Sequence, residues 1–162
     1  MFILAPERDE DPRGAFGRYD GYIRRESARF PPGAIALATS DWYFGFEDHR
    51  APHDAWLVSA AFEEVGDCAR RDERTLALRL RLLSAYHDHE LEFYYPKVVG
   101  YTFQGMSVAA GHGDWRYDEF RLDDAGQLIH EIQWHARDER AVWMITSNDV
   151  VFTSRKVPSA DR

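Results

Sequence analysis

Long apolar runs are missing from this chain of 162 residues. Charged residues interrupt even the richest apolar stretches within ten positions, so none is long enough to span a bilayer. The apolar start MFILA is followed at once by Pro6, Glu7 and Arg8, without the charged n-region and long h-region of a secretory signal. Cysteine is also scarce, because Cys68 stands alone and cannot form an internal disulfide. These absences predict a cytoplasmic protein with no membrane partner.

A basic segment is missing as well. The 20 Lys and Arg residues are scattered and outnumbered by 28 Asp and Glu residues, which gives a formal net charge of -8. Nucleic-acid binding usually requires a basic patch that contacts phosphates, so we expect no nucleic-acid partner. The acidic balance favours a protein partner with a basic surface.

Established catalytic motifs are absent too: the sequence has no G-x-S-x-G, S-x-x-K, HExxH, paired CxxC or phosphate-binding Gly-rich loop. We therefore expect no catalytic residues, no cofactor and no metal site, and no need of a divalent metal for folding. Histidines do cluster near acids, which keeps a metal- or acid-base-dependent small-molecule enzyme as the alternative, although a turn tip would leave His87 and His89 exposed and mobile. The clusters are His49, His53 and Asp54; His87, Asp88, His89 and Glu90; and His130 with His135.

The chain is rich, by contrast, in period-two alternation between Thr75 and Gln104. Such alternation is typical of half-buried strands, and the two runs predict an antiparallel hairpin with a four-residue loop, 85–88. In this register Arg81 lies opposite Glu92 and can form a cross-strand ion pair. Pro96 is expected to end the second strand. The apolar row that should form the core is Leu76, Leu78, Leu80, Leu82, Leu91, Phe93 and Tyr95.

Helices are expected before the strands. Residues 1–18 are rich in charge, Pro and Gly, and should form an irregular arm. Asp20 can cap a short helix that ends before Pro31, and Pro32 can begin a second one that runs to Ala38. Strands other than the hairpin are expected at 55–65, 98–104, 115–123, 128–135, 142–146 and 150–153, with a charged turn at 66–74 and a long loop at 105–114. The alanines and the two glutamates of 55–65 also allow a helix there, and the last two segments can be two short strands or one strand with a bulge.

Together these elements predict one α+β domain over residues 1–162. Short N-terminal helices are followed by a largely antiparallel, strongly twisted sheet or partly closed barrel of seven to eight strands. With 44% hydrophobic residues, the chain is long enough to bury a core without disulfides or metals. Residues 157–162 should form a frayed tail.

Two segments combine aromatic rings with carboxylates: DWYFGFED at 41–48 and GDWRYDE at 113–119. Most large aromatics are expected in the core. Both segments nevertheless lie in or beside irregular stretches, where binding groups concentrate, and exposed rings next to acids would suit a basic, arginine-bearing partner. The predicted partner-binding set is Trp42, Tyr43, Asp48, Asp114, Trp115, Tyr117 and Asp118.

The order of several short motifs resembles a pattern of small bacterial immunity proteins from polymorphic toxin systems. HDAWL is followed by the Leu-rich strand, then by LEFYYPKVVGYTF and finally by WMITSNDVVF, a match that runs from about His53 to Phe152. The resemblance implies a cytoplasmic protein that blocks a toxin by binding it, without catalysis. The positions that match the pattern are His53, Asp54 and Asp149, whose residue types also suit capping and turns.

Overall fold

Helices form the N-terminal part of the computed structural model, which describes residues 1–66, 74–105 and 111–157. The 3-10 helix η1 (Pro6–Asp9) precedes α1 (Pro12–Glu26), and η2 (Ser27–Arg29) precedes α2 (Pro32–Ala38). The predicted second helix is confirmed, and it begins at Pro32 as expected. Residues 67–73, 106–110 and 158–162 lie outside the described residues; they include Cys68, most of the predicted charged turn and tail, and half of the predicted long loop.

The prediction of an irregular arm over residues 1–18 is wrong, and so is the prediction that the first helix begins at Asp20. Asp11 caps α1, because its side-chain oxygen accepts a 2.9 Å hydrogen bond from the backbone N–H of Gly14, and a proline occupies the first helical position. One face of α1 is buried through Ala15, Tyr19 and Ile23. Burial of this face outweighs the charge and glycine content on which the sequence argument relied.

Among the described residues, seven strands follow the helices, and every strand pairing is antiparallel. The strand order is β2-β1-β4-β5-β6-β3-β7, and β2 also pairs with β3, so the hydrogen bonding runs in a ring. One residue pair, Trp56 with Asp114, joins β1 to β4. The predicted α+β class with an antiparallel sheet is confirmed. The strands are β1 (Trp56–Gly66), β2 (Arg74–Leu83), β3 (His89–Phe103), β4 (Asp114–Leu122), β5 (Leu128–Ala136), β6 (Glu139–Ser147) and β7 (Val151–Lys156).

The predicted hairpin of β2 and β3 has the expected register, with Arg81 opposite Glu92. The expected ion pair between these two residues is wrong, because the ion pairs run diagonally: Arg81 binds Glu90, and Arg79 binds Glu92. Long side chains reach a diagonal neighbour as easily as the residue directly opposite. Of the predicted core row, Leu78, Leu80, Leu82, Leu91, Phe93 and Tyr95 are fully buried, and Leu76 is partly buried.

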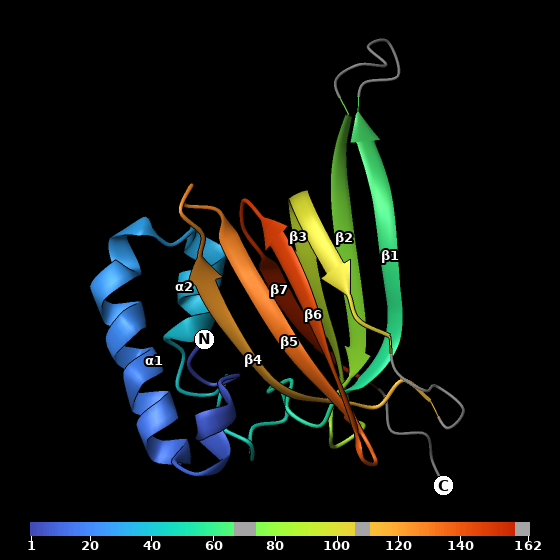
Figure 1. The fold of residues 1–162 in the computed structure, drawn as a ribbon. Coiled ribbons are helices and arrows are strands. Elements are labelled where there is room, and N and C mark those ends of the chain that lie inside the picture. The colour runs from blue at the N-terminus through green and yellow to red at the C-terminus, as the bar shows by residue number, and fades with distance from the viewer. Residues whose placement is uncertain (67–73, 106–110, 158–162) are drawn as a thin grey trace, which may run out of the picture.

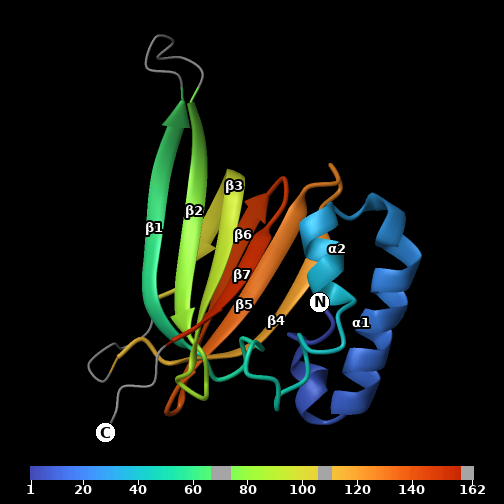
Figure 2. The ribbon, with the colours of Figure 1, turned by 180° about the vertical axis from the view of Figure 1, so that it is seen from behind.

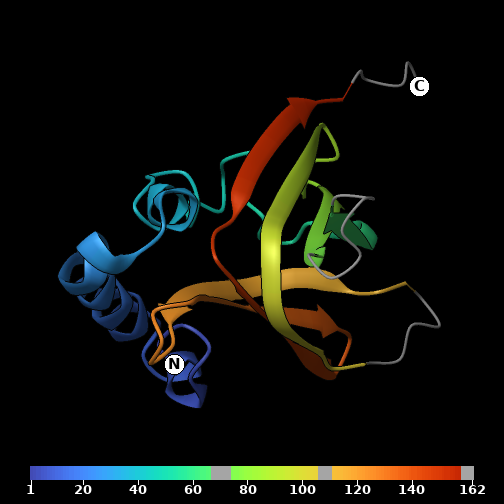
Figure 3. The ribbon, with the colours of Figure 1, turned by 90° about the horizontal axis from the view of Figure 1, so that it is seen from above.

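Pro96 does not end a strand, which corrects a second detail of the hairpin. β3 continues through it to Phe103. The register of β3 with β2 shifts once across this proline, between Tyr95 and Val98. A proline cannot donate to the ladder, so a register shift at its position is the usual solution. Beyond the shift Val98 still pairs with Leu76 of β2, and the pairing of β3 with β6 also begins at Val98. Figure 3 shows β3 passing from the side of β7 and β2 toward β6.

The helices and the β1–β2 hairpin lie on opposite sides of the molecule. Figures 1 and 2 show α1 and α2 beside β4, whereas β1 and β2 extend beyond the ends of the other strands. The helix α2 contacts both β4 and β7. Buried side chains from the helices, such as Tyr19 and Ile23, join the residues of the sheet in one hydrophobic core. The segment between α2 and β1, residues 39–55, therefore runs from the helical side to the hairpin side.

Candidate functional site

Three members of the predicted partner-binding set cannot be part of an exposed surface. Trp115 is fully buried, Tyr43 is 1% exposed and Asp118 is 3% exposed. The Asp118 carboxylate accepts hydrogen bonds from the Tyr43 hydroxyl (2.7 Å) and from the Trp115 indole N–H (3.0 Å). Both rings can be buried because their polar atoms find a partner inside the protein, and a neighbouring acid was misread as a sign of exposure.

Asp118 also belongs to a buried network with a histidine. His130 Nε2 lies 2.9 Å from Asp118 Oδ2, and His130 Nδ1 lies 2.6 Å from the Tyr95 hydroxyl oxygen. Burial raises the pKa values of Tyr43 and Tyr95 well above the usual value of 10, so both hydroxyl groups keep their protons. A histidine between a carboxylate and a tyrosine resembles the acid-base groups of enzymes.

Substrate cannot reach this network. The cavity that borders Asp118 has a volume of about 10 Å³, roughly the space of one water molecule. Phe46 and His53 lie on its wall, with their rings stacked at 4.1 Å. We therefore interpret the network as structural: it satisfies the polar groups of a core that is rich in aromatic rings.

The segment 41–50, by contrast, forms an open depression on the surface, with a volume of about 790 Å³. We call it the 41–50 depression. Phe46 is 46% exposed and Trp42 is partly buried, so both rings are accessible. The residues that line the 41–50 depression are Asp41, Trp42, Gly45, Phe46, Glu47, Asp48 and Arg50.

Arg50 occupies part of this depression. Its guanidinium carbon lies 4.7 Å from the centre of the Trp42 ring, and two of its nitrogens lie 2.9 Å from the Asp48 oxygens. Hydrogen bonds from Arg50 lower the pKa of Asp48 to about 2. Asp41 and Glu47 have no ion-pair partner in the described part of the chain. The depression thus has two uncompensated carboxylates beside its aromatic rings.

Tyr117 and Asp114, the other two predicted partner-binding residues, lie in different surroundings. The Tyr117 ring is partly buried beneath the Arg8 guanidinium, at 4.1 Å, and lies 6.2 Å from the Phe46 ring. Asp114 lines a separate cavity of about 450 Å³ near Trp56. Partial burial, and then the charge of Asp54, raise the pKa of Asp114. The structure therefore brings Tyr117 close to the 41–50 depression but leaves Asp114 in another site.

The three positions that match the immunity-protein pattern have structural contacts. Asp149 caps α2 from a distant part of the chain, because its oxygens accept hydrogen bonds from the backbone N–H groups of Gly33 (3.1 Å) and Ala34 (3.2 Å). Asp54 adopts a positive φ of 59° and binds Arg116 at 2.9 Å. His53 stacks on Phe46, as described above. The interpretation as capping and turn residues is confirmed for the two aspartates.

An exposed cluster combines residues from two of the histidine groups that lie far apart in the sequence. His49 Nδ1 lies 2.7 Å from Asp88 Oδ2, and His89 Nδ1 lies 2.9 Å from Asp88 Oδ1. His87 is exposed, as expected for the tip of a turn, but His89 is partly buried at the start of β3. Because 39 positions separate His49 from Asp88, no spacing rule within one segment could have found this cluster.

Sequence reasoning also missed Glu119, whose side chain is fully buried. One of its oxygens accepts hydrogen bonds from the backbone N–H groups of Phe2 (2.8 Å), Ile3 (2.7 Å) and Leu4 (3.2 Å), which fixes the start of the chain against β4. The available signal was the adjacent pair of Asp118 and Glu119 inside a strand that is rich in aromatic residues.

Comparisons with known proteins give no indication of function. Within the described residues, none of the helices has the length and apolar character needed to cross a membrane. Searches against models of protein families, curated proteins and solved structures found no match to this chain.

Proposed function

We propose that this chain is a non-catalytic binding protein that receives a basic protein surface in the 41–50 depression. Inhibition of a toxin, as in the immunity proteins that the sequence resembles, is one form that such binding would take. A cytoplasmic location is part of the same proposal and is supported by the lone cysteine, which cannot form an internal disulfide. Of the predicted partner-binding residues, the proposal keeps Trp42 and Asp48, with Tyr117 at the margin.

One observation carries the proposal: a guanidinium group already occupies the depression. Arg50 contacts the face of Trp42 and both oxygens of Asp48, the arrangement by which an arginine of a partner would bind. The neighbouring carboxylates of Asp41 and Glu47 could bind further cations. The exposed Phe46 ring adds an apolar anchor of the type found at the centre of interfaces.

The alternative, an acid-base enzyme, loses support at its best candidate. The histidine and carboxylate of the His130–Asp118 network have the hydrogen bonding of a catalytic pair, yet the adjoining cavity holds about one water molecule. A general base must reach the proton that it abstracts, and a buried pair with no room for substrate cannot do so. The exposed histidine cluster is a separate matter and is considered below.

Charge reversal in the depression tests the proposal with a nona-arginine peptide as the probe. We expect the peptide to shift the NMR signals of residues 41–50 and of the Trp42 indole N–H. The double variant Asp41→Lys/Glu47→Lys should weaken its binding by about tenfold or more, because like charges then face the peptide. Phe46→Ala should leave the salt dependence of peptide binding unchanged and raise the rate at which the peptide dissociates.

A matched control separates local charge from net charge. Asp124→Lys/Asp138→Lys changes the net charge by the same amount at two exposed positions outside the depression. This control should alter peptide binding by less than about twofold at ~0.15 M salt, where the Debye length is ~8 Å. Equal weakening by both double variants, or signal shifts centred elsewhere, would show that the 41–50 depression is not the binding site.

A further inference from the structure

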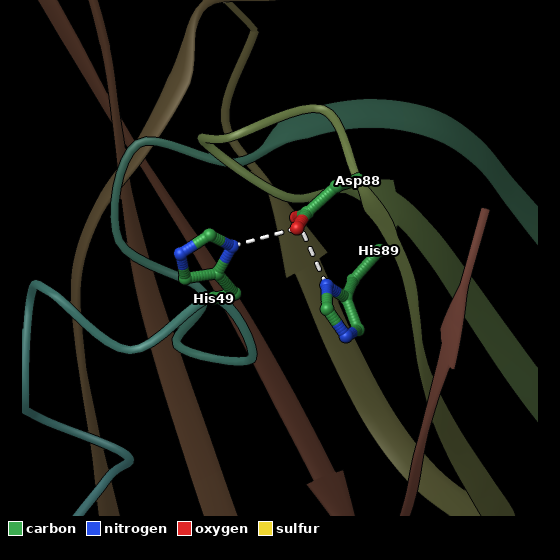
Figure 4. A group of neighbouring side chains, drawn as sticks. All are labelled: His49, Asp88 and His89. Carbon is green, nitrogen blue, oxygen red and sulfur yellow. Dashed lines mark hydrogen bonds and ion pairs between the residues drawn. The ribbon is translucent and has the colours of Figure 1, made fainter. Parts of the chain in front are cut away.

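The exposed histidine cluster has the geometry of a metal-binding site. One nitrogen from each of His49 and His89 and an oxygen of Asp88 lie within 4.8 Å of one another. Figure 4 shows the two imidazole rings on opposite sides of the Asp88 carboxylate, each directing a nitrogen toward it. The ring planes are 73° apart, with centroids 6.0 Å from each other. Three donor atoms from two distant segments thus converge on one point.

Neighbouring residues hold these donors in position. The Ser84 hydroxyl donates to Asp88 Oδ1 at 3.3 Å, and the backbone N–H of Val157 donates to the Asp88 carbonyl at 2.7 Å. The His49 ring stacks on Tyr86, with centroids 4.0 Å apart and planes 13° from parallel. Contacts of this kind orient the ligands in metal sites. The expectation that the turn leaves His89 exposed is wrong, because its side chain is partly buried at the start of β3.

The donor set suits a particular class of cation. Two imidazole nitrogens and one carboxylate oxygen are ligands of Zn²⁺ and related transition metals, whereas Ca²⁺ and Mg²⁺ prefer oxygen ligands alone. Hydrogen bonds from His89 first, and then from His49, lower the pKa of Asp88 to about 2, so the carboxylate is charged at neutral pH. The His49 side chain is 48% exposed, which leaves room for water at the remaining coordination positions.

We propose that His49, Asp88 and His89 bind a divalent transition-metal ion of the Zn²⁺ type. The ion would take the place of the protons in the hydrogen bonds between the two histidines and Asp88, and these protons would be released to water. It would also join the 39–55 segment to the β2–β3 turn. Because His49 stands between Asp48 and Arg50 in the sequence, bound metal would also restrain the 41–50 depression. The metal site itself does not depend on the proposed binding function.

The test is a metal titration of the full chain, after bound metal has been removed with a chelator and the chelator has been removed in turn. Isothermal titration calorimetry with Zn²⁺ should give one site per chain, and Co²⁺ should give the visible absorption of a nitrogen- and oxygen-ligated ion. Asp88→Asn and His49→Gln should each lower Zn²⁺ affinity by about tenfold or more. His87→Asn is the matched control: it removes an exposed histidine from the same turn, and asparagine tolerates the positive φ of 58° found there.

The control variant should change Zn²⁺ affinity by less than about twofold. Thermal unfolding measured without metal verifies that all three variants fold, which separates a lost ligand from a lost fold. Zn²⁺ binding that survives both ligand substitutions would place the ion elsewhere and overturn the proposal. Absence of binding to the unmodified chain up to 1 mM Zn²⁺ would overturn it as well.

Discussion

Two histidine–aspartate clusters in this molecule share their chemistry and differ in their access to solvent. His130 and Asp118 lie 2.9 Å apart with side chains that are 0% and 3% exposed. His49 and Asp88 lie 2.7 Å apart with side chains that are 48% and 29% exposed. The comparison teaches that hydrogen bonding alone does not identify a functional site, because the buried cluster can only stabilise the fold whereas the open cluster can bind a ligand.

The same difference should appear in stability. The Asp118 carboxylate satisfies three buried donors, from Tyr43, Trp115 and His130. Removal of one partner from a buried polar network leaves the others desolvated and unpaired, which is strongly destabilising. Asp88 lies at the surface, where water replaces a lost partner and ion pairs contribute little.

The largest expected effect is therefore that of Asp118→Ala. We expect it to lower the free energy of unfolding by roughly 3–5 kcal/mol. The matched substitution Asp88→Ala should leave the unfolding midpoint of the metal-free protein almost unchanged. Urea denaturation of the two variants measures both effects. Equal midpoint shifts would mean that the two clusters are not structurally distinct.

A smaller effect concerns His53, which covers the cavity beside Asp118. Burial lowers the pKa of His53 below the ordinary value of 6.5. Protonation is therefore easier in the unfolded chain, and the stability associated with neutral His53 is present above pH 6.5 and is lost as the pH falls through the lower folded value. We expect the free energy of unfolding to be smaller at pH 5.5 than at pH 7.5.

The variant His53→Gln assigns this pH dependence, because glutamine does not titrate. Urea denaturation of this variant at the two pH values should show a smaller difference than the unmodified chain shows. The exposed-residue variant His87→Asn serves as the control and should retain the full difference. A His53→Gln variant with an unchanged pH dependence would assign the effect to other groups.

The sequence was informative where residue periodicity and backbone chemistry decide the structure. Alternation of leucines placed Leu80 opposite Phe93, and proline at a first helical position placed the start of α2. These signals are local or extend across one turn. The start of α1 was missed because burial of its face against the sheet, which involves distant residues, outweighs local composition.

The candidate sites were harder to predict for the same physical reason. The exposure of Trp115 depends on whether its indole N–H finds a buried acceptor, and Asp118 supplies that acceptor only once β4 has formed. His49 meets Asp88 because the 39–55 segment returns to the β2–β3 turn, which no pattern within either segment records. Segment 41–48 was recognised by its composition, but the contact between Arg50 and Trp42 was not.

The most direct test of the comparison is to observe all seven histidines at once during a Zn²⁺ titration. A two-dimensional ¹H–¹⁵N spectrum of the imidazole groups, recorded on the full chain at pH 7.5, reports the state of each ring nitrogen. We expect the signals of His49 and His89 to change in proportion to bound Zn²⁺. The signals of His130 should stay unchanged throughout and report a single tautomer of its ring. Changes at His130, or an absence of change at His49 and His89, would contradict the assignment of a sealed structural cluster and an open ligand-binding one.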